Sequence, residues 1–186
     1  MRKLAHLLAL LLSLSPAQVK AQSPAPVPEE LLLRRQESQL LHRKIDLSTL
    51  RVLRKTDFVA GETPVARLIL VHLWAVECKP CLDELPTLRS FFEAQAKDPR
   101  LKLVIASETR DAGKLLEFLK QHRGYFPNGD LYQIIDDRLR SSLQNFAQPL
   151  TLLVDERGVV HQSFVGSLRS RRSELVDAVE RYLKAL

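Results

Sequence analysis

The chain has 186 residues and a formal net charge of +6 at pH 7; its first 21 residues hold three bases and no acids, which leaves +3 for the rest. The remaining bases alternate with acids and apolar residues, a pattern typical of a solvated surface that argues against nucleic-acid binding. After the N-terminal segments about 140 to 155 residues remain, enough for one domain with a single core.

The N-terminus has the pattern of an export signal. Two bases precede an apolar run from Leu4 to Leu14, and a small-residue ending at Ala21 resembles a cleavage site. The run has eleven residues and falls short of the roughly 20 that cross a bilayer. No cysteine lies near the cleavage point to take a lipid. We therefore expect a signal peptide over residues 1–21 and a periplasmic or secreted mature chain without a stable membrane span.

Residues 22–47 read as a linker followed by a helical arm. The stretch Ser23–Pro28 is rich in proline and tends to stay extended. A helix is expected over residues 29–44, because two acids suit its positive N-terminal end. This arm either packs on the domain or serves as a mobile extension. The main domain is expected at residues 48–186.

Hydrophobic periodicity predicts the elements of this domain in chain order. Strands or short apolar stretches are expected at 48–54, 68–75, 101–106, 131–135, 150–155 and 159–165, the last two forming an antiparallel hairpin. Helices are expected at 79–96, 111–122, 138–146 and 174–186, and a loop surrounds Gly61 and Pro64. Strands that alternate with helices predict an α/β fold, a layered sheet covered on both faces.

The two cysteines of the chain, Cys78 and Cys81, stand at the start of the helix expected at 79–96. A structural disulfide usually closes a long loop, and a two-residue gap does little to restrict the unfolded chain. Cysteines at i and i+3 of a first helical turn face the same way and can be bridged. The positive end of the helix lowers the pKa of a thiol there. We therefore expect a redox pair with Cys78 as nucleophile and Cys81, more enclosed, as resolving thiol.

Other uses of the pair are less well supported by the sequence. Structural zinc usually needs four ligands, and no second CxxC or HxxxH accompanies the first. Copper(I) needs only soft ligands, so a copper chaperone that uses the two thiolates stays open as an alternative. A peroxidase would rely on a lone cysteine in a threonine-containing surround, which is not found. We expect no metal and no cofactor beyond the redox-active disulfide.

Two segments resemble a known family. The stretch from His72 to Cys81, HLWAVECKPC, combines a buried strand, a Trp-Ala pair, a CxxC with proline before the second cysteine, and a helix. It resembles the active-site segment of thioredoxin-fold proteins, and Asp83–Pro86 (DELP) is similar to the exported TlpA/ResA branch. Residues 148–158 are similar to that branch's segment around its cis-proline. The resemblance covers residues 65–166 and implies a thioredoxin-like fold, a central mixed β-sheet with helices on both faces.

The resemblance also implies an activity. It implies a thiol:disulfide oxidoreductase that exchanges disulfides with protein substrates and acts as a reductant. An unidentified electron donor would then re-reduce the Cys78–Cys81 disulfide. Pro149 would be a cis-proline facing the cysteines, and Gln148 would present its backbone to an incoming peptide as if to an added strand. Copper proteins of the Sco type usually have a longer cysteine gap and a distant histidine, which counts against that alternative.

Four residues near the pair have expected supporting roles. Pro80 suits the early turn of a helix and stiffens the loop between the sulfurs. Lys79 should favour a thiolate and Glu77 should oppose it, and the sequence does not decide which effect is larger; both are equally consistent with plain exposed charge. Glu77 departs from the family, where an aromatic residue is common. Trp74 should form a wall of the core and of the site.

Two further titratable residues could reach the pair. His72 occupies a position where many relatives carry a polar or acidic group beneath the cysteines. Its imidazole could relay the proton of Cys81, or it could simply pack against the strand. Glu84 could influence the pair or lie on the helix surface.

Overall fold

The structure is a computed structural model that describes residues 27–54, 57–60, 64, 66–95, 97–126, 131–134 and 137–186. Its strands are β1 (Leu50–Arg54), β2 (Asp57–Ala60), β3 (Leu68–Trp74), β4 (Leu101–Ser107), β5 (Leu131–Ile134), β6 (Leu150–Asp155) and β7 (Val160–Val165). Its helices are α1 (Glu29–Leu40), α2 (Lys79–Gln95), α3 (Ala112–His122), α4 (Asp137–Leu143) and α5 (Arg172–Ala185), with a 3-10 turn at Arg123–Tyr125. The expected signal peptide and the start of the linker lie outside the described residues.

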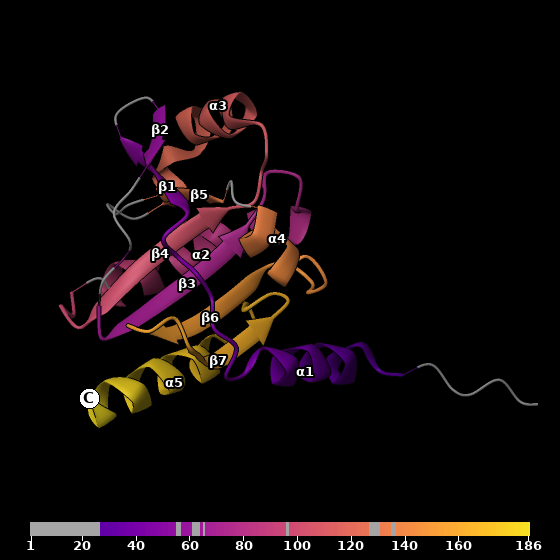
Figure 1. Ribbon diagram of the computed structural model, residues 1–186. Coiled ribbons are helices and arrows are strands. Elements are labelled where there is room, and N and C mark those ends of the chain that lie inside the picture. The colour runs from indigo at the N-terminus through magenta and orange to yellow at the C-terminus, as the bar shows by residue number, and fades with distance from the viewer. Residues whose placement is uncertain are drawn as a thin grey trace, which may run out of the picture.

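The described strands form one seven-stranded sheet in the order β2-β1-β5-β4-β3-β6-β7 (Figure 1). The central pairs β3/β4 and β4/β5 are parallel, whereas β6 runs antiparallel to both β3 and β7. The expected mixed sheet and the C-terminal hairpin are confirmed. At the other edge β1 pairs antiparallel with β5 and β2.

Strand β3 is central because both of its faces are covered. All seven of its residues are buried. Leu68, Leu70 and Trp74 join a core with the inner faces of α2, α3 and α5. The alternate residues of β3 join a second core with α1 and α4. Burial on both faces explains why this strand reads as a continuous apolar run instead of an alternating one.

The end of helix α1 and the presence of strand β2 differ from the sequence-based expectation. Helix α1 ends at Leu40 instead of residue 44, because the following residues leave the helix to pair with the edge of β7. Val160 both accepts from the His42 amide at 2.8 Å and donates to the Arg43 carbonyl at 2.9 Å. Strand β2 was not expected, since its four residues carry no alternating pattern long enough to signal a strand.

Within the described ranges, no helix combines the length and the apolar character that crossing a membrane requires.

The turn after β6 packs closely against the N-terminal arm, and a substitution in this turn tests that contact. Gly158 has a φ of +82°, and a Cβ there would lie 2.4 Å from the Ile45 carbonyl oxygen. Gly158→Ala should therefore lower the free energy of unfolding by about 2 kcal/mol or more in urea titrations. Gly124→Ala is the control, because its added Cβ would meet only the end of the Arg89 side chain at 3.9 Å. Equal stabilities of the two variants would contradict this fit.

Candidate active site

The cysteine pair lies where β3 gives way to α2. The strand ends at Trp74 and the helix begins at Lys79, so Cys78 directly precedes the first helical residue. Cys78 and Cys81 form a disulfide with Cα atoms 5.3 Å apart. Cys81 is fully buried, whereas Cys78 is partly exposed. Only the first sulfur is therefore open to attack by a partner.

The start of the helix supplies hydrogen-bond donors to the exposed sulfur. The Cys81 amide lies 3.2 Å from the Cys78 Sγ and donates to it. The first amides of a helix lack partners within the helix, and they carry the positive end of its dipole. Pro80 occupies the second position of α2, where its missing N–H costs no helical bond. This setting stabilises a thiolate on Cys78 once the disulfide is reduced.

The charge of Lys79 is paired within its own helix. Its Nζ lies 2.8 Å from an Asp83 carboxylate oxygen, and its side chain is 83% exposed. An exposed pair of this kind contributes little to stability. Because the Asp83 carboxylate offsets its charge, Lys79 adds little net positive potential at the sulfurs.

Glu77 forms an ion pair with a lysine of helix α3. Its carboxylate lies 2.8 Å from the Lys114 Nζ and accepts from the Thr109 hydroxyl at 3.2 Å. Hydrogen bonding to Lys114 holds the pKa of Glu77 below its usual value. Lys114 is itself placed by the cap of α3, where the Asp111 carboxylate accepts from its amide. Because Glu77 and Lys79 each have a counter-charge, the helix terminus remains as the main electrostatic influence on Cys78.

A histidine and a carboxyl group meet in the core beneath the pair. His72 and Glu84 are both completely buried, and the His72 Nε2 lies 3.7 Å from the Glu84 Oε1. Among the residues that the structure describes, neither of these two atoms has a hydrogen-bond partner. Glu84 follows Cys81 by one helical turn, so the two share the buried side of α2. The expectation that Glu84 might lie on the helix surface is wrong.

Burial acts on this pair in opposite directions. It lowers the pKa of His72 to about 4, so the imidazole is neutral at pH 7. It raises the pKa of Glu84, although the Ser167 hydroxyl and the Leu168 amide donate to the other carboxylate oxygen and partly offset the effect. The His72 Nδ1 lies 2.9 Å from the Thr151 hydroxyl on β6. A neutral imidazole and a protonatable carboxyl group are thus held together in a dry site.

The peptide bond between Gln148 and Pro149 is cis, as the resemblance implies. Pro149 is buried and directly precedes β6, two residues before the Thr151 that contacts His72. The Gln148 side-chain amide donates to the carboxylate of Glu108. Strand β6 therefore links the cis-proline to the buried histidine.

Glu108 and Thr109 are site residues that the sequence analysis missed. The Glu108 amide donates to the Trp74 carbonyl at 2.8 Å, and burial raises the pKa of its carboxyl group. The Thr109 hydroxyl accepts from the Val76 amide at 2.9 Å. Both follow β4, which runs parallel to β3, and the carboxyl ends of parallel strands lie at one edge of a sheet. Polar residues directly after the second buried strand were the available signal.

Trp74 is a core residue, as expected. It is 1% exposed, and its ring lies 5.2 Å from the Phe126 ring and 5.5 Å from the Phe118 ring, centroid to centroid. Its indole Nε1 has no hydrogen-bond partner within the described ranges. The ring packs the end of β3 against α3, which supports the backbone just before the cysteines.

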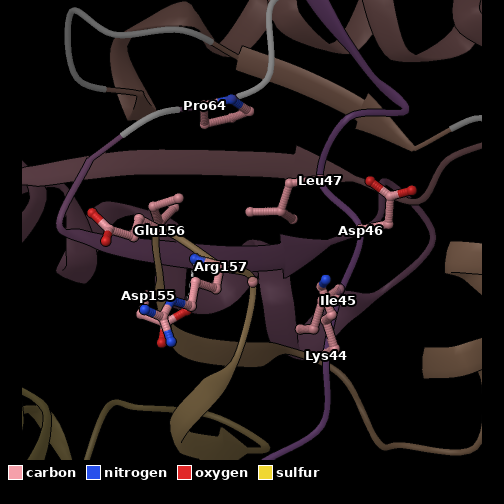
Figure 2. A pocket seen from close by; sticks show the side chains of 10 residues that line it. Lys44, Ile45, Asp46, Leu47, Pro64, Asp155, Glu156 and Arg157 are labelled. Atoms are coloured by element: carbon pink, nitrogen blue, oxygen red, sulfur yellow. Dashed lines mark hydrogen bonds between the residues drawn. The ribbon is translucent and has the colours of Figure 1, made fainter.

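A cavity of about 430 Å³ lies between the segment after α1 and the turn after β6 (Figure 2). Its lining includes Lys44, Leu47, Ile69 and Arg157. None of its lining side chains has a buried polar atom without a partner. We assign it no ligand. Elsewhere in the part of the chain that the structure describes, no group of three or more His, Cys, Asp or Glu residues could hold a metal ion.

Comparisons with known proteins agree with the fold. No protein-family model matches the chain. The thioredoxin-like protein YneN of Bacillus subtilis is 28% identical over 109 residues, 57% of this chain and 61% of YneN. The sporulation thiol-disulfide oxidoreductase A of the same organism is 24% identical over 108 residues, 55% of this chain and 62% of that protein. The matched region thus spans less than two thirds of either curated relative.

A solved structure, that of StoA from Bacillus subtilis, superposes with a TM-score of 0.51 at 20% identity and covers 66% of this chain and 93% of StoA. The expected thioredoxin-like fold is confirmed. The chain thus has a thioredoxin-like fold, and it is similar in sequence to a thioredoxin-like protein and to a thiol-disulfide oxidoreductase.

The buried pair predicts a pH dependence of stability. The unfolded chain binds a proton on His72 more readily than the folded protein does, so the folded state loses stability as the pH falls from about 6.5 towards about 4. This loss amounts to about 3 kcal/mol at most. In His72→Gln it should be absent, so the variant should gain stability relative to the original chain as the pH falls.

Urea unfolding of the oxidised protein between pH 7 and pH 4 measures this difference. Glu84→Gln should show the opposite trend, because the raised pKa of Glu84 gives stability at low pH that is lost as the pH rises. A difference between His72→Gln and the original chain that does not vary with pH would show that the imidazole is not buried in its neutral form.

Proposed function

We propose that this protein is a thiol:disulfide oxidoreductase that exchanges disulfides with protein substrates through Cys78 and Cys81. One observation carries the proposal: a disulfide at the start of α2 whose first sulfur is partly exposed and whose second is fully buried. The similarity to named thiol-disulfide oxidoreductases supports it.

In the proposed reaction the reduced protein attacks a partner disulfide. The Cys78 thiolate forms a bond to one partner sulfur, and the other partner sulfur leaves as a thiolate. The resulting mixed disulfide joins Cys78 to the partner. Gln148 and cis-Pro149 are proposed to receive the partner's backbone beside the sulfurs, with the Gln148 side chain held by Glu108.

The second step requires Cys81 to lose a proton inside the core. We assign that proton to Glu84, the carboxyl group one helical turn away, with the neutral imidazole of His72 as its neighbour. The Cys81 thiolate then attacks the Cys78 Sγ and releases the second partner sulfur as a thiolate, which takes up a proton from water. The partner leaves reduced by two electrons, and the Cys78–Cys81 disulfide is restored.

The direction and place of action complete the proposal. A reductant role follows from the TlpA/ResA resemblance, and it needs a thiol electron donor to reduce the Cys78–Cys81 disulfide after each cycle. The apolar run at residues 4–14 supports export to the periplasm or beyond. Because known CxxC potentials span roughly −270 to −120 mV, equilibration with glutathione identifies the direction.

Substitution of each cysteine separates the two steps. Cys78→Ser should abolish reduction of a disulfide-bonded protein such as insulin, because the attacking thiolate is removed. Cys81→Ser should still attack but stop at the mixed disulfide, which mass spectrometry without reductant would detect. Turnover by Cys78→Ser would refute the assignment.

Glu84→Gln tests the proton acceptor. Glutamine keeps an oxygen for the Ser167 and Leu168 donors but cannot take up a proton. Resolution of the mixed disulfide should slow by about tenfold or more, with little change in the first attack by Cys78. Single-turnover kinetics with a chromogenic disulfide resolves the two phases. Equal slowing of both phases would point to a structural effect instead.

Copper(I) chaperoning by the same two thiolates remains a separate alternative that no contact at the site specifically favours. Anaerobic titration of the reduced protein with copper(I) tests it. Tight one-to-one binding that is lost in the double Cys→Ser variant would support copper handling.

A further inference from the structure

The loop between β7 and α5, residues 166–171, holds two parts of the candidate site. The Gly166 amide donates to the Pro149 carbonyl at 2.8 Å. The Leu168 amide donates to Glu84 Oε2 at 2.7 Å, and the Ser167 hydroxyl donates to the same oxygen. The cis-proline and the proposed proton acceptor are therefore tied to one short segment.

The same loop is bracketed at both ends by one carboxylate from α1. Glu37 Oε1 accepts from the Val165 amide, just before the loop, at 2.9 Å. It also accepts from the Arg171 guanidinium, at the end of the loop, at 2.6 Å. The Glu37 residue is only 7% exposed, and its carboxylate also lies 3.5 Å from Arg34 Nη1, while Arg171 also contacts Glu174. Glu37 is thus the buried centre of a network of charged side chains.

Two further contacts fasten α1 to the site. Gly166 has a φ of +83°, and a Cβ there would lie 3.2 Å from a methyl group of Leu33, so the helix packs directly on the loop. Gln36 accepts from the Ala147 amide at 2.8 Å, two residues before the cis-proline. Figure 1 shows α1 beside β7. Neighbouring residues of one helix thus reach both segments that frame the site.

We propose that α1 is a brace of the candidate active site and that Glu37 is a positioning residue that acts on Glu84 and cis-Pro149 through the β7–α5 loop. The catalytic consequence rests on the proposed function, whereas the bracing itself does not. The N-terminal arm is in this view part of the reactive unit, so removal or displacement of α1 changes the chemistry of the cysteines from a distance.

Amide hydrogen exchange in the oxidised full chain tests the bracing directly. Glu37→Ala should accelerate exchange at the Gly166 and Leu168 amides by about threefold or more, although neither amide contacts Glu37. Ser38→Ala is the matched control on the same helix, because its exposed hydroxyl donates to the Arg35 carbonyl within the helix itself. Faster exchange confined to Val165 in Glu37→Ala would overturn the proposal.

A second variant covers the case in which Glu37→Ala does not fold. Glu37→Gln keeps an acceptor for the Val165 amide and loses the buried charge that pairs with Arg171, which Glu174 still contacts. We expect a smaller acceleration at Gly166 and Leu168. Unchanged exchange at both amides in Glu37→Gln would then overturn the brace.

The pH profile of disulfide exchange gives the catalytic readout. The Leu168 and Ser167 donors lower the pKa of Glu84, so a loosened loop should raise it and move the acid limb of the profile to higher pH. A merely structural role of Glu37 would lower thermal stability and leave the profile in place, which contradicts the proposal. If the original chain showed no disulfide exchange, the proposed function would be refuted. The amide hydrogen-exchange result would still show whether α1 braces the loop.

Discussion

The end of a fully buried strand fixes the position of the cysteine pair, and the rest of the site depends on that constraint. Strand β3 is packed on both faces, so its last residue, Trp74, has little freedom to move. Helix α2 starts within the next turn and shares the same core. The two sulfurs are therefore held at the positive end of a helix by hydrophobic packing on both sides. Because Glu77 and Lys79 are each paired elsewhere, the backbone amides dominate the potential at Cys78.

Polar groups from distant segments complete the site, and their burial costs free energy. His72, Glu84 and Glu108 come from a strand, a helix and a loop. Burial lowers the pKa of His72 and raises the pKa of the two carboxyl groups, and in each case it favours the neutral form. Such groups are expensive to bury unless their partners are in place. The structure supplies most of those partners, including Thr151 and Gln148. The two unpartnered atoms of His72 and Glu84 lie 3.7 Å apart, at the point where the proposed proton transfer would take place.

The N-terminal arm both covers an edge of the sheet and contacts the segments around the cis-proline. Strand β7 is an edge of the sheet, and an open edge invites pairing with other chains. Residues that follow α1 pair with that edge, while Glu37 and Gln36 reach the segments around the cis-proline. Protection of the edge and support of the site are therefore coupled in the folded protein.

The sequence by itself determined the cysteine pair at a helix start, the buried strand before it and the hairpin after Pro149, because these follow from local periodicity and a contiguous motif. The thioredoxin-like fold was implied by the resemblance of two segments to a known family. Only the tertiary structure decided the end of α1 at Leu40, the pairing of β2 and the balance of the charges beside Cys78. It also decided the approach of His72 to Glu84 and the bracket formed by Glu37. These features join residues far apart along the chain, and side-chain hydrogen bonds between such residues leave no periodic signature in a single sequence.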